Sequence, residues 1–370
     1  MQEKPSVCIL TSVHRSSDVR IYQKQARSLA GAGYPVTLIS PGSPPEERSD
    51  VRFIEFKKPK SRFLRILLSP FQILRLALGQ KSKIYHFHDP ELIFTGFCLR
   101  LLRKKVIYDA HEDVPRQILS KPWIKPFLRR LLSGLFECYE NLFCRIFTRV
   151  VTATPEIQRR FLKVNKNTVH VGNYPILNET GVSAADYDSR PGCYCYIGAV
   201  SRVRGIREAV QAAADIKAPF ILAGDFDSPA LYDEIRALPG WANTDFRGFV
   251  GRQEVAAILS SARAGLVTLH PIPNYMESLP IKMFEYMAAG VPVVASDFPY
   301  WRKIIEGESC GVCVDPLDPP AIAAAIAFIL DNPEKAREMG ENGRRLALSK
   351  YNWENEKQKL LAMYESILSG

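Results

Sequence analysis

The chain has 370 residues, of which 46% are hydrophobic and 24% are charged. Its formal net charge of +10 is unevenly divided, since residues 1–170 carry +16 and residues 171–370 carry −6, which predicts an anionic partner for the first half. This length favours two domains, the composition excludes a disordered chain, and the sequence has neither an uninterrupted apolar run of membrane-spanning length nor the pattern of a secretory signal.

Strand-like apolar runs alternate with helix-like segments along the chain, which is typical of parallel sheets with crossover helices. In the first half the predicted strands are 7–12, 35–40, 51–56, 83–88, 105–110 and 149–154. In the second half they are 193–200, 219–224, 244–249, 264–269, 291–296 and 311–316. A polar, turn-rich stretch at 173–192 separates the two sets and is predicted to be a linker. The pattern therefore predicts two α/β domains of the nucleotide-binding type.

Two segments of the first half, 61–83 and 121–149, mix large apolar residues with Arg and Lys, among them Arg65, Arg129 and Arg130. In the second segment five apolar residues fall at helical spacing: Leu128, Leu131, Leu132, Leu135 and Phe136. One interpretation is a set of helices packed on the sheet, with snorkelling basic side chains. The other is a basic amphipathic surface that lies on anionic lipid.

The stretch NYMESLPIKMFEYMAAGVPVVAS, residues 274–296, carries the most chemical information. Pro280 suits the first position of a helix, so Glu277 is predicted to lie in a loop before the helix and Glu285 on its second turn. The backbone N–H groups near Ser278, Leu279 and Ile281 are then predicted to be free to bind a diphosphate. A carboxylate before the helix can accept hydrogen bonds from sugar hydroxyls, and one on the second turn can hold a ribose diol.

Glu277 and Glu285, followed by FEYMAAGVPVVAS, closely resemble the signature of the family-4 retaining glycosyltransferases, which have the GT-B fold. Other segments resemble the same family: GAVSRVRG at 198–205 its phosphate-binding loop, ILAGDFDSP at 221–229 the following strand and turn, and HFHDPE at 86–91 and IYDAHED at 107–113 its N-terminal loops. The resemblance covers nearly the whole chain. It implies an α/β fold with two Rossmann-like domains facing across a cleft and a C-terminal helix that crosses back to the first domain.

In domain terms, the resemblance implies an acceptor-side domain at 1–172, joined by the crossover helix at 352–370, and a domain at 190–350 that binds the nucleotide sugar. It also implies catalytic roles for Glu277 and His88, which would contact the donor sugar, and for Arg204, which would neutralise the departing diphosphate. The donor would further be bound by Glu285, through the ribose, and by Ser278, Leu279, Arg202 and Gly198. Where the family has an arginine after the first glycine, this chain has Ala199, and Arg202 is predicted to replace that arginine.

Four further residues are acceptor-side candidates. His14 and Asp18 follow the first strand, where open α/β sheets bind ligands, and His111 and Glu112 end another strand on that side. His86, two residues before His88, is predicted to point to the opposite face of its strand and to pack there.

No metal and no other cofactor are expected. Asp225 and Asp227 form a D-x-D, which holds a divalent cation in other transferase folds but is interpreted here as turn chemistry. Cys310 and Cys313 have the spacing of half a zinc site, without a second pair downstream. The eight cysteines are therefore expected to be free thiols in a reducing cytoplasm.

Together these features predict a retaining, metal-independent hexosyltransferase that moves a sugar from a nucleoside diphosphate sugar to a saccharide or lipid-linked saccharide in cell-surface polysaccharide biosynthesis. We expect it in the cytoplasm, peripheral on the inner face of an anionic membrane, with no nucleic-acid partner. Two alternatives stay open: a GT-B-fold sugar-nucleotide epimerase, and an inactive membrane-associated scaffold, against which the intact glutamate pair speaks. The sequence leaves open the sugar, the nucleoside base, the acceptor and the oligomeric state.

Overall fold

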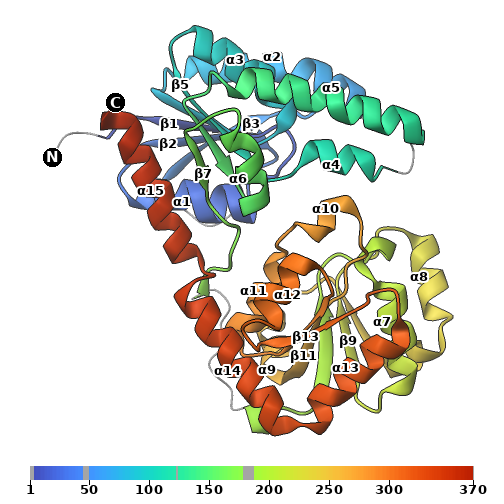
Figure 1. The fold of residues 1–370 in the computed structure, drawn as a ribbon. Coiled ribbons are helices and arrows are strands. Elements are labelled where there is room, and N and C mark those ends of the chain that lie inside the picture. The colour runs from blue at the N-terminus through green and yellow to red at the C-terminus, as the bar shows by residue number, and fades with distance from the viewer. Residues whose placement is uncertain (1–3, 45–49, 122–123, 178–186, 370) are drawn as a thin grey trace. The chain divides into compact units, whose positions relative to one another are not determined.

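The computed structural model describes residues 4–44, 50–121, 124–177 and 187–369. The chain forms two compact units (Figure 1), of which one comprises Met1–Asn173 with Glu354–Gly370 and the other Tyr174–Trp353. We call them the N-terminal unit and the C-terminal unit. The final helix thus belongs to the N-terminal unit, although the chain reaches it only after completing the C-terminal one.

The N-terminal unit is built on a parallel sheet of seven strands in the order β3-β2-β1-β4-β5-β6-β7. The strands are β1 (Val7–Leu10), β2 (Val36–Pro41), β3 (Val51–Phe56), β4 (Ile84–Phe87), β5 (Lys105–Ala110), β6 (Arg149–Thr152) and β7 (Thr168–His170). β1 and β4 are buried along their whole length, which is why they stand out as apolar runs in the sequence. The six predicted strands are confirmed. β7 is missing from the prediction because three residues are too few to show a period.

Helices cover this sheet in Figure 1, with α2, α3 and α5 together on one side. The helices of the N-terminal unit are η1 (Val19–Ala26), α1 (Arg27–Gly31), α2 (Arg62–Gly79), η2 (Pro90–Leu92), α3 (Ile93–Leu101), α4 (Val114–Leu119), α5 (Pro126–Cys144), α6 (Pro155–Leu162) and α15 (Trp353–Ser369). The last of these is tied to the sheet by Tyr364, whose hydroxyl lies 2.9 Å from Nδ1 of His86 on β4.

The C-terminal unit contains a parallel sheet of six strands in the order β10-β9-β8-β11-β12-β13. They are β8 (Cys193–Ile197), β9 (Phe220–Ala223), β10 (Thr244–Gly248), β11 (Ala262–Val267), β12 (Val293–Ser296) and β13 (Gly311–Val314), and all six were predicted. The α-helices are α7 (Ile206–Ala212), α8 (Pro229–Arg236), α9 (Arg252–Ser261), α10 (Pro273–Met276), α11 (Ile281–Ala288), α12 (Pro299–Ile305), α13 (Pro319–Asp331) and α14 (Pro333–Ser349). Short 3-10 turns are η4 (Tyr187–Ser189), η5 (Arg202–Arg204), η6 (Ala213–Asp215) and η7 (Pro239–Asn243).

The predicted linker at 173–192 lies partly outside the described residues. Its described ends are integral to the C-terminal unit, because the ring of Tyr174 packs against Phe284 and Tyr351. Arg190 is buried and donates hydrogen bonds to the carbonyl oxygens of Ala262 and Ala289. This unit therefore begins at Tyr174, ahead of the expected start at residue 190.

The helices α2 and α5 expose large apolar side chains. Phe63 on α2 is 73% exposed, and Leu131 and Leu135 on α5 are 56% and 59% exposed. The fully buried positions of α5 are instead Ser133, Glu140 and Cys144. Packing of the whole predicted stripe on the sheet is therefore wrong: Phe136 packs into the core and Leu128 is half-buried, whereas Leu131, Leu132 and Leu135 face solvent.

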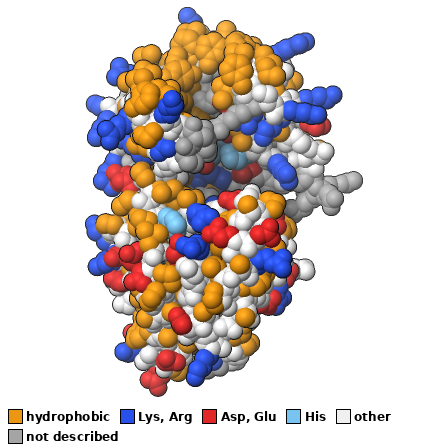
Figure 2. All heavy atoms as spheres, turned by 90° about the vertical axis from the view of Figure 1, so that its right-hand side faces the viewer, with side chains coloured by type: hydrophobic (Ala, Val, Ile, Leu, Met, Phe, Trp, Pro, Cys, Tyr) orange, Lys and Arg blue, Asp and Glu red, His pale blue; other side chains and the backbone are white. Residues whose placement is uncertain are grey.

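Figure 2 shows hydrophobic side chains gathered over the N-terminal unit, with Lys and Arg around them. Two of the basic residues that we expected on this surface, Arg65 and Arg129, have partners within the protein. Arg65 forms an ion pair with Glu91 at 3.2 Å, Arg129 donates to the carbonyl oxygen of Ile124, and the side chain of Arg62 lies outside the described residues. Arg130, in contrast, is exposed. Within the described ranges, no helix is both long and apolar enough to cross a bilayer.

Candidate active site

Two glycines bring the loop after β8 close to the end of β11. Gly198 has a φ of +134° and Gly205 a φ of +71°, which L-residues with a side chain rarely adopt. A Cβ atom on Gly205 would lie 1.9 Å from the carbonyl oxygen of Thr268, and one on Gly198 would lie 2.9 Å from Nζ of Lys282. The loop therefore needs glycine at both positions, and a cationic side chain lies directly beside Gly198.

That cation, Lys282, is a site residue that the sequence reasoning missed. Its side chain is buried on α11, with Nζ 3.5 Å from the centroid of the Tyr196 ring and without a hydrogen-bond partner. Burial lowers the pKa of Lys282 well below its ordinary value, and the charge of Arg204 lowers it further while Glu285 opposes the change. An unpaired buried ammonium is costly, so an anion bound here would supply the missing partner. The only sequence signal was a lysine among the apolar residues of a predicted helix.

The two arginines of this loop differ in their surroundings. Arg204 is half-buried beside Tyr196 and Lys282, near the position that a Cβ of Gly198 would take. Arg202 instead forms a bidentate ion pair with Glu234 on α8 and is 55% exposed. The structure gives Arg202 an acidic partner of its own in the free protein, and its predicted role as the replacement for the arginine missing at Ala199 stays a prediction. Lys282 is the cationic residue that lies beside this loop, next to Gly198.

The turn before α11 differs in detail from the prediction. Pro280 caps the helix, which begins at Ile281, and Glu277 ends the short helix α10. The N–H of Ser278 is not free, because it donates to the carbonyl oxygen of Tyr275 at 3.1 Å, and its hydroxyl donates to the same oxygen. A hydrogen bond from the indole of Trp301 to the carbonyl oxygen of Ser278 holds the turn in place. The predicted anion contact of the Ser278 N–H is thus wrong for this conformation, while Leu279 and Ile281 donate no backbone hydrogen bond within the described residues.

The two signature glutamates are presented differently. Glu277 is exposed and its carboxylate has no hydrogen-bond or ion-pair partner in the described part of the chain. Glu285 lies on the second turn of α11, as predicted, and accepts a hydrogen bond from Arg252 at 2.8 Å. Arg252 therefore fixes the direction of the Glu285 carboxylate, whereas the Glu277 carboxylate is free to meet a ligand.

The D-x-D of the C-terminal unit lies in a turn after β9. The carbonyl oxygen of Asp225 accepts from the N–H of Val200, and the N–H of Asp227 donates to the carbonyl oxygen of Val200. These bonds tie the turn to the loop after β8, which fits the interpretation as turn chemistry.

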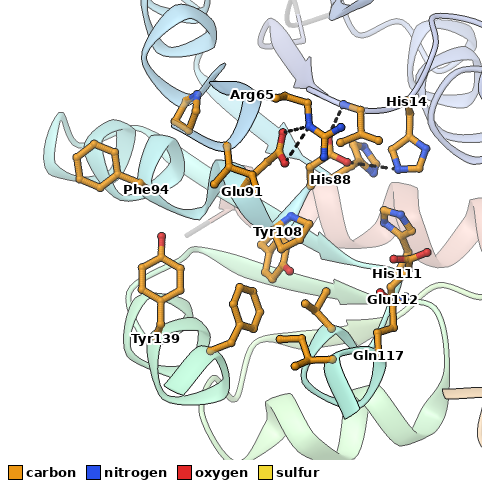
Figure 3. A pocket seen from close by; sticks show the side chains of 18 of the residues that line it. His14, Arg65, His88, Glu91, Phe94, Tyr108, His111, Glu112, Gln117 and Tyr139 are labelled. Carbon is orange, nitrogen blue, oxygen red and sulfur yellow. Dashed lines mark hydrogen bonds and ion pairs between the residues drawn. The ribbon is translucent and has the colours of Figure 1, made fainter. Parts of the chain in front are cut away.

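A cavity of about 840 Å³ opens in the N-terminal unit at the C-terminal ends of β1, β4 and β5. Figure 3 shows Phe94 and Tyr139 at one end of it, and His14, His111 and Glu112 at the other. The lining residues used below are Ile66, Leu67, Phe71, Phe94, Val114, Ile118, Phe136 and Tyr139 on the apolar side and His14, His88, Asp89, Glu91, His111, Glu112 and Gln117 on the polar side. Three of the four acceptor-side candidates, His14, His111 and Glu112, thus line one pocket together with His88.

Asp89 organises the polar end of this pocket and was not singled out in the sequence. Its Oδ2 atom accepts from the hydroxyl of Thr11 at 2.7 Å and from the N–H of Ser12 at 2.6 Å. Its Oδ1 atom lies 3.3 Å from Nε2 of His14, whose Nδ1 lies 3.3 Å from Asp18. Burial works to lower the pKa of His14, but Asp18 and Asp89 together raise it above its ordinary value.

Asp18 lies beside this pocket and does not line it. It caps η1 by accepting from the N–H of Ile21 at 2.9 Å. Burial works to raise its pKa, but the bonds from His14 and Ile21 lower the pKa of Asp18 to about 2. Its charge therefore serves to orient His14.

His86 and His88 stack with ring centroids 4.8 Å apart, so the expectation that they face opposite sides is wrong. The reason is geometric, because successive strand residues alternate and residues two apart share a face. His88 is buried, with Nδ1 3.3 Å from Oδ2 of Asp109, and neither of its ring nitrogens has a well-aligned hydrogen-bond partner.

His86, His88 and Asp109 are the described residues whose ligand atoms lie close enough together to hold a metal ion. Burial works to raise the pKa of Asp109, but Arg20 and His88 hold it well below its usual range. The carboxylate already accepts from Arg20 at 2.9 and 3.0 Å and from Gln25 at 2.6 Å. A guanidinium already neutralises Asp109, and the cluster forms a polar network that positions His88.

Two family profiles match the chain. The profile described as "Glycosyl transferases group 1" matches residues 186–346, and "Glycosyltransferase Family 4" matches residues 20–172. Among relatives, alpha-D-kanosaminyltransferase of Streptomyces kanamyceticus is 29% identical over 49% of this chain and 47% of its own length. Phosphatidyl-myo-inositol mannosyltransferase of Mycobacterium leprae is 27% identical over 93% of this chain and 91% of its own length. The chain thus spans about half of the first of these relatives and nearly all of the second.

Solved structures share the fold. Sucrose-phosphate synthase of Thermosynechococcus elongatus superposes with a TM-score of 0.78 at 20% identity, covering 99% of this chain and 100% of the other. Anabaena HepE in complex with UDP-glucose superposes with a TM-score of 0.74 at 13% identity, covering 98% and 100%. The predicted fold class, α/β with two Rossmann-like domains of the GT-B type, is confirmed.

Proposed function

Because the chain belongs to the glycosyltransferases of group 1 and family 4, we propose that it transfers a sugar from a nucleoside diphosphate sugar to an acceptor hydroxyl with retention of configuration. The acceptor class is a saccharide or lipid-linked saccharide, and the process is the assembly of a cell-surface glycan. HepE, which shares the fold, was solved with UDP-glucose, and a relative along most of the chain is named as a mannosyltransferase acting on phosphatidyl-myo-inositol.

The observation that carries this proposal is the buried, unpaired ammonium of Lys282 beside Gly198. A bound diphosphate would raise the pKa of this amine again, so that Lys282 and Arg204 together present positive charge at a glycine loop, where a diphosphate can approach the backbone. The unpaired N–H groups of Leu279 and Ile281 lie at the start of α11 on the same unit. A diphosphate would satisfy all of these donors at once, which is a physical reason for the lysine to be there.

In this proposal the two glutamates bind the donor at different points. Glu285, held by Arg252, accepts hydrogen bonds from the ribose hydroxyls, and the free carboxylate of Glu277 accepts them from the hydroxyls of the transferred sugar. Arg204 and Lys282 neutralise the diphosphate. The predicted contact of His88 with the donor sugar stays a prediction.

The reaction proposed is a front-face displacement. The acceptor oxygen forms a bond to the anomeric carbon, the bond from that carbon to the diphosphate oxygen breaks, and the acceptor proton moves to the departing diphosphate. Catalysis then consists mainly of positioning and of stabilising the negative charge that grows on the leaving group. Arg204 and Lys282 supply the positive charge that a divalent cation supplies in other transferases, so we propose that no metal takes part.

The test is calorimetric titration with nucleoside diphosphates of different bases, followed by a product assay with the matching sugar nucleotide in EDTA. We expect one nucleotide to bind, turnover to survive EDTA, and Glu277→Ala to lose turnover while melting at the temperature of the wild type. Failure of every nucleotide to bind, or turnover that only a divalent cation restores, would contradict the proposal. Isomerised sugar nucleotide formed without acceptor would favour the epimerase.

We further propose that the protein works in the cytoplasm as a peripheral protein on an anionic membrane surface. The exposed apolar residues of α2 and α5 and the +16 charge of the first 170 residues support this proposal. Vesicle binding tests it, as set out in the Discussion.

A further inference from the structure

The pocket of the N-terminal unit has two chemically different ends. At one end α2, α3 and α5 contribute Phe71, Phe94, Phe136 and Tyr139, and the ring centroids of Phe71 and Phe94 lie 5.7 Å apart. At the other end lie His14, His88 and Asp89, and Figure 3 shows Gln117 on the same side as His111 and Glu112. A ligand that fills this pocket must itself be apolar at one end and polar at the other.

The polar end contains a buried histidine whose hydrogen bonding is incomplete. His88 is 1% exposed and lines the pocket; its Nδ1 lies 3.3 Å from Oδ2 of Asp109, whereas its Nε2 has no hydrogen-bond partner among the described residues. Such a group is costly to bury unless a ligand or water completes its hydrogen bonding. A hydroxyl-bearing ligand head would provide that partner, because a hydroxyl can both donate and accept.

The apolar end is continuous with the exposed apolar surface of α2 and α5. Ile66, Leu67 and Phe71 line the pocket and are also 50%, 53% and 56% exposed, so the same side chains belong to both. The exposed basic residues Arg75, Lys125 and Arg130 lie on or next to these two helices. An apolar chain can therefore pass from a bilayer into the pocket without crossing a polar surface.

We propose that this pocket binds a lipid-linked acceptor, whose hydrocarbon chain lies along α2, α3 and α5 and whose hydroxyl-bearing head lies at His14, His88 and Asp89. The volume of about 840 Å³ is within the range of pockets that enclose an extended small molecule. The basic residues around the apolar surface favour this occupant, because lipid-linked acceptors come from membranes whose surface is anionic. The inference rests on the proposed function, since it identifies the acceptor class for that transfer.

The test uses simple amphiphiles with a saccharide head: octyl, decyl and dodecyl maltoside, each below its critical micelle concentration, with maltose alone as the head-group control. Calorimetric titration of the full-length protein measures each affinity. Burial of one methylene strengthens binding about fourfold, so each step of two methylenes should strengthen binding by about 15-fold where the chain is enclosed. Maltose should bind more weakly than octyl maltoside, and therefore more than about 200-fold more weakly than the dodecyl compound.

Two variants address the pocket in different ways. Ile118→Trp fills it without adding charge, and Phe94→Arg places a charge against the chain; both should flatten the dependence of affinity on chain length. Leu132→Arg is the matched control, because Leu132 lies on α5, is 42% exposed and does not line the pocket. It should keep the full dependence. Circular-dichroism melts establish that each variant is folded, and Ile118→Trp carries the test if Phe94→Arg is not.

Nucleotide binding is titrated in the same preparations, so the two proposals fail separately. A flat chain-length series in wild-type protein that binds nucleotide would overturn the lipid pocket and leave the proposed function standing. If Leu132→Arg abolishes the dependence of affinity on alkyl-chain length and Ile118→Trp does not, the alkyl chain binds on the outer surface of α5. That result would also overturn the lipid pocket. A dimer in the absence of amphiphile that Phe94→Arg dissociates would identify a second copy of this chain as the occupant.

Discussion

At the scale of single residues, the candidate donor site depends on which cations face the glycine loop and which face away. Arg202 and Arg204 are two positions apart, yet the first pairs with Glu234 and the second lies next to Lys282. Sequence alone could not separate them, because the separating contact is with a glutamate on another helix. The same limit hid Lys282, whose burial depends on the approach of a loop about 80 residues earlier in the chain.

This difference makes the two arginines a matched pair for mutation. Arg204→Ala should weaken binding of a nucleoside diphosphate by roughly 10- to 100-fold, because it removes a charge-assisted hydrogen bond of about 1.5–3 kcal/mol. Arg202→Ala should change the affinity less than twofold, since its partner is an exposed glutamate. Calorimetric titration of both variants measures this. Equal losses would mean that Arg202 leaves Glu234 when the nucleotide binds.

Lys282 should couple nucleotide binding to proton uptake. Its pKa is lowered in the free protein, and a bound diphosphate would raise it, so affinity should fall as pH rises between the free and the bound pKa. Titrations in buffers of different ionisation enthalpy measure the protons taken up, and Lys282→Met should lower that uptake. Protons that the nucleotide itself gains or releases on binding contribute equally in the wild type and the variant. The difference in proton uptake between the two proteins therefore reports Lys282.

The same lowered pKa gives a sign for stability. The unfolded chain binds more protons at Lys282 than the folded one between the two pKa values, so this residue makes stability rise with pH across that window. Lys282→Met should flatten the rise in denaturant-unfolding measurements. An unchanged slope would show that the ammonium is charged in the free protein.

At the scale of elements, strands were predictable where they are buried on both faces, as in β1, and not where they are short, as in β7. The helix α5 could not be placed from its period. Its leucines form a regular apolar stripe, but the residues that bury it are Ser133 and Glu140, whose partners are the carbonyl oxygen of Pro115 and the hydroxyl of Tyr108. The inward face of α5 mixes these polar residues with Phe136 and Cys144, so the period of its leucines does not show which side faces the core.

The loop 198–205 offers a test of element packing. Gly205→Ala should cost about 1–2 kcal/mol for the left-handed backbone, and more for the contact with the carbonyl oxygen of Thr268. Gly248→Ala isolates the backbone cost, because Gly248 has a φ of +62° and nothing within 4 Å of an added Cβ. Urea denaturation should show a larger loss for Gly205→Ala. Equal losses would indicate that the loop moves aside at little cost.

At the scale of the whole molecule, composition and pattern were sufficient for the two α/β units and the signature glutamates, and the division of charge was visible from the start. They could not show the cavity, because it is made where Phe94, Ile118 and Tyr139 from three helices meet the strand ends. The stacking of His86 and His88 was also not predicted, although side chains alternate along a strand and residues two apart therefore share a face. Contacts between distant segments are what a one-dimensional pattern leaves out.

The charge of the N-terminal half leads to a prediction for the intact protein. Apolar burial by α2 and α5 and attraction of the surrounding cations act together, so the protein should co-sediment with anionic vesicles and much less with neutral ones. Raising the salt concentration should weaken this binding, because screening shortens the range of the attraction. Arg75→Ser, Lys125→Ser and Arg130→Ser combined should remove roughly 3 kcal/mol, at about 1 kcal/mol for each charge.

The control removes an equal charge from the other unit, where Lys217, Arg236 and Lys303 are also exposed. A triple serine variant at these positions should bind vesicles as the wild type does, because the apolar helices and the excess charge both lie in the N-terminal unit. Equal losses in the two triple variants would show that net charge alone brings the protein to the vesicle. If wild-type protein ignores anionic vesicles even at low salt, the exposed leucines of α5 serve a partner other than a membrane, and the route from bilayer to pocket loses its first step.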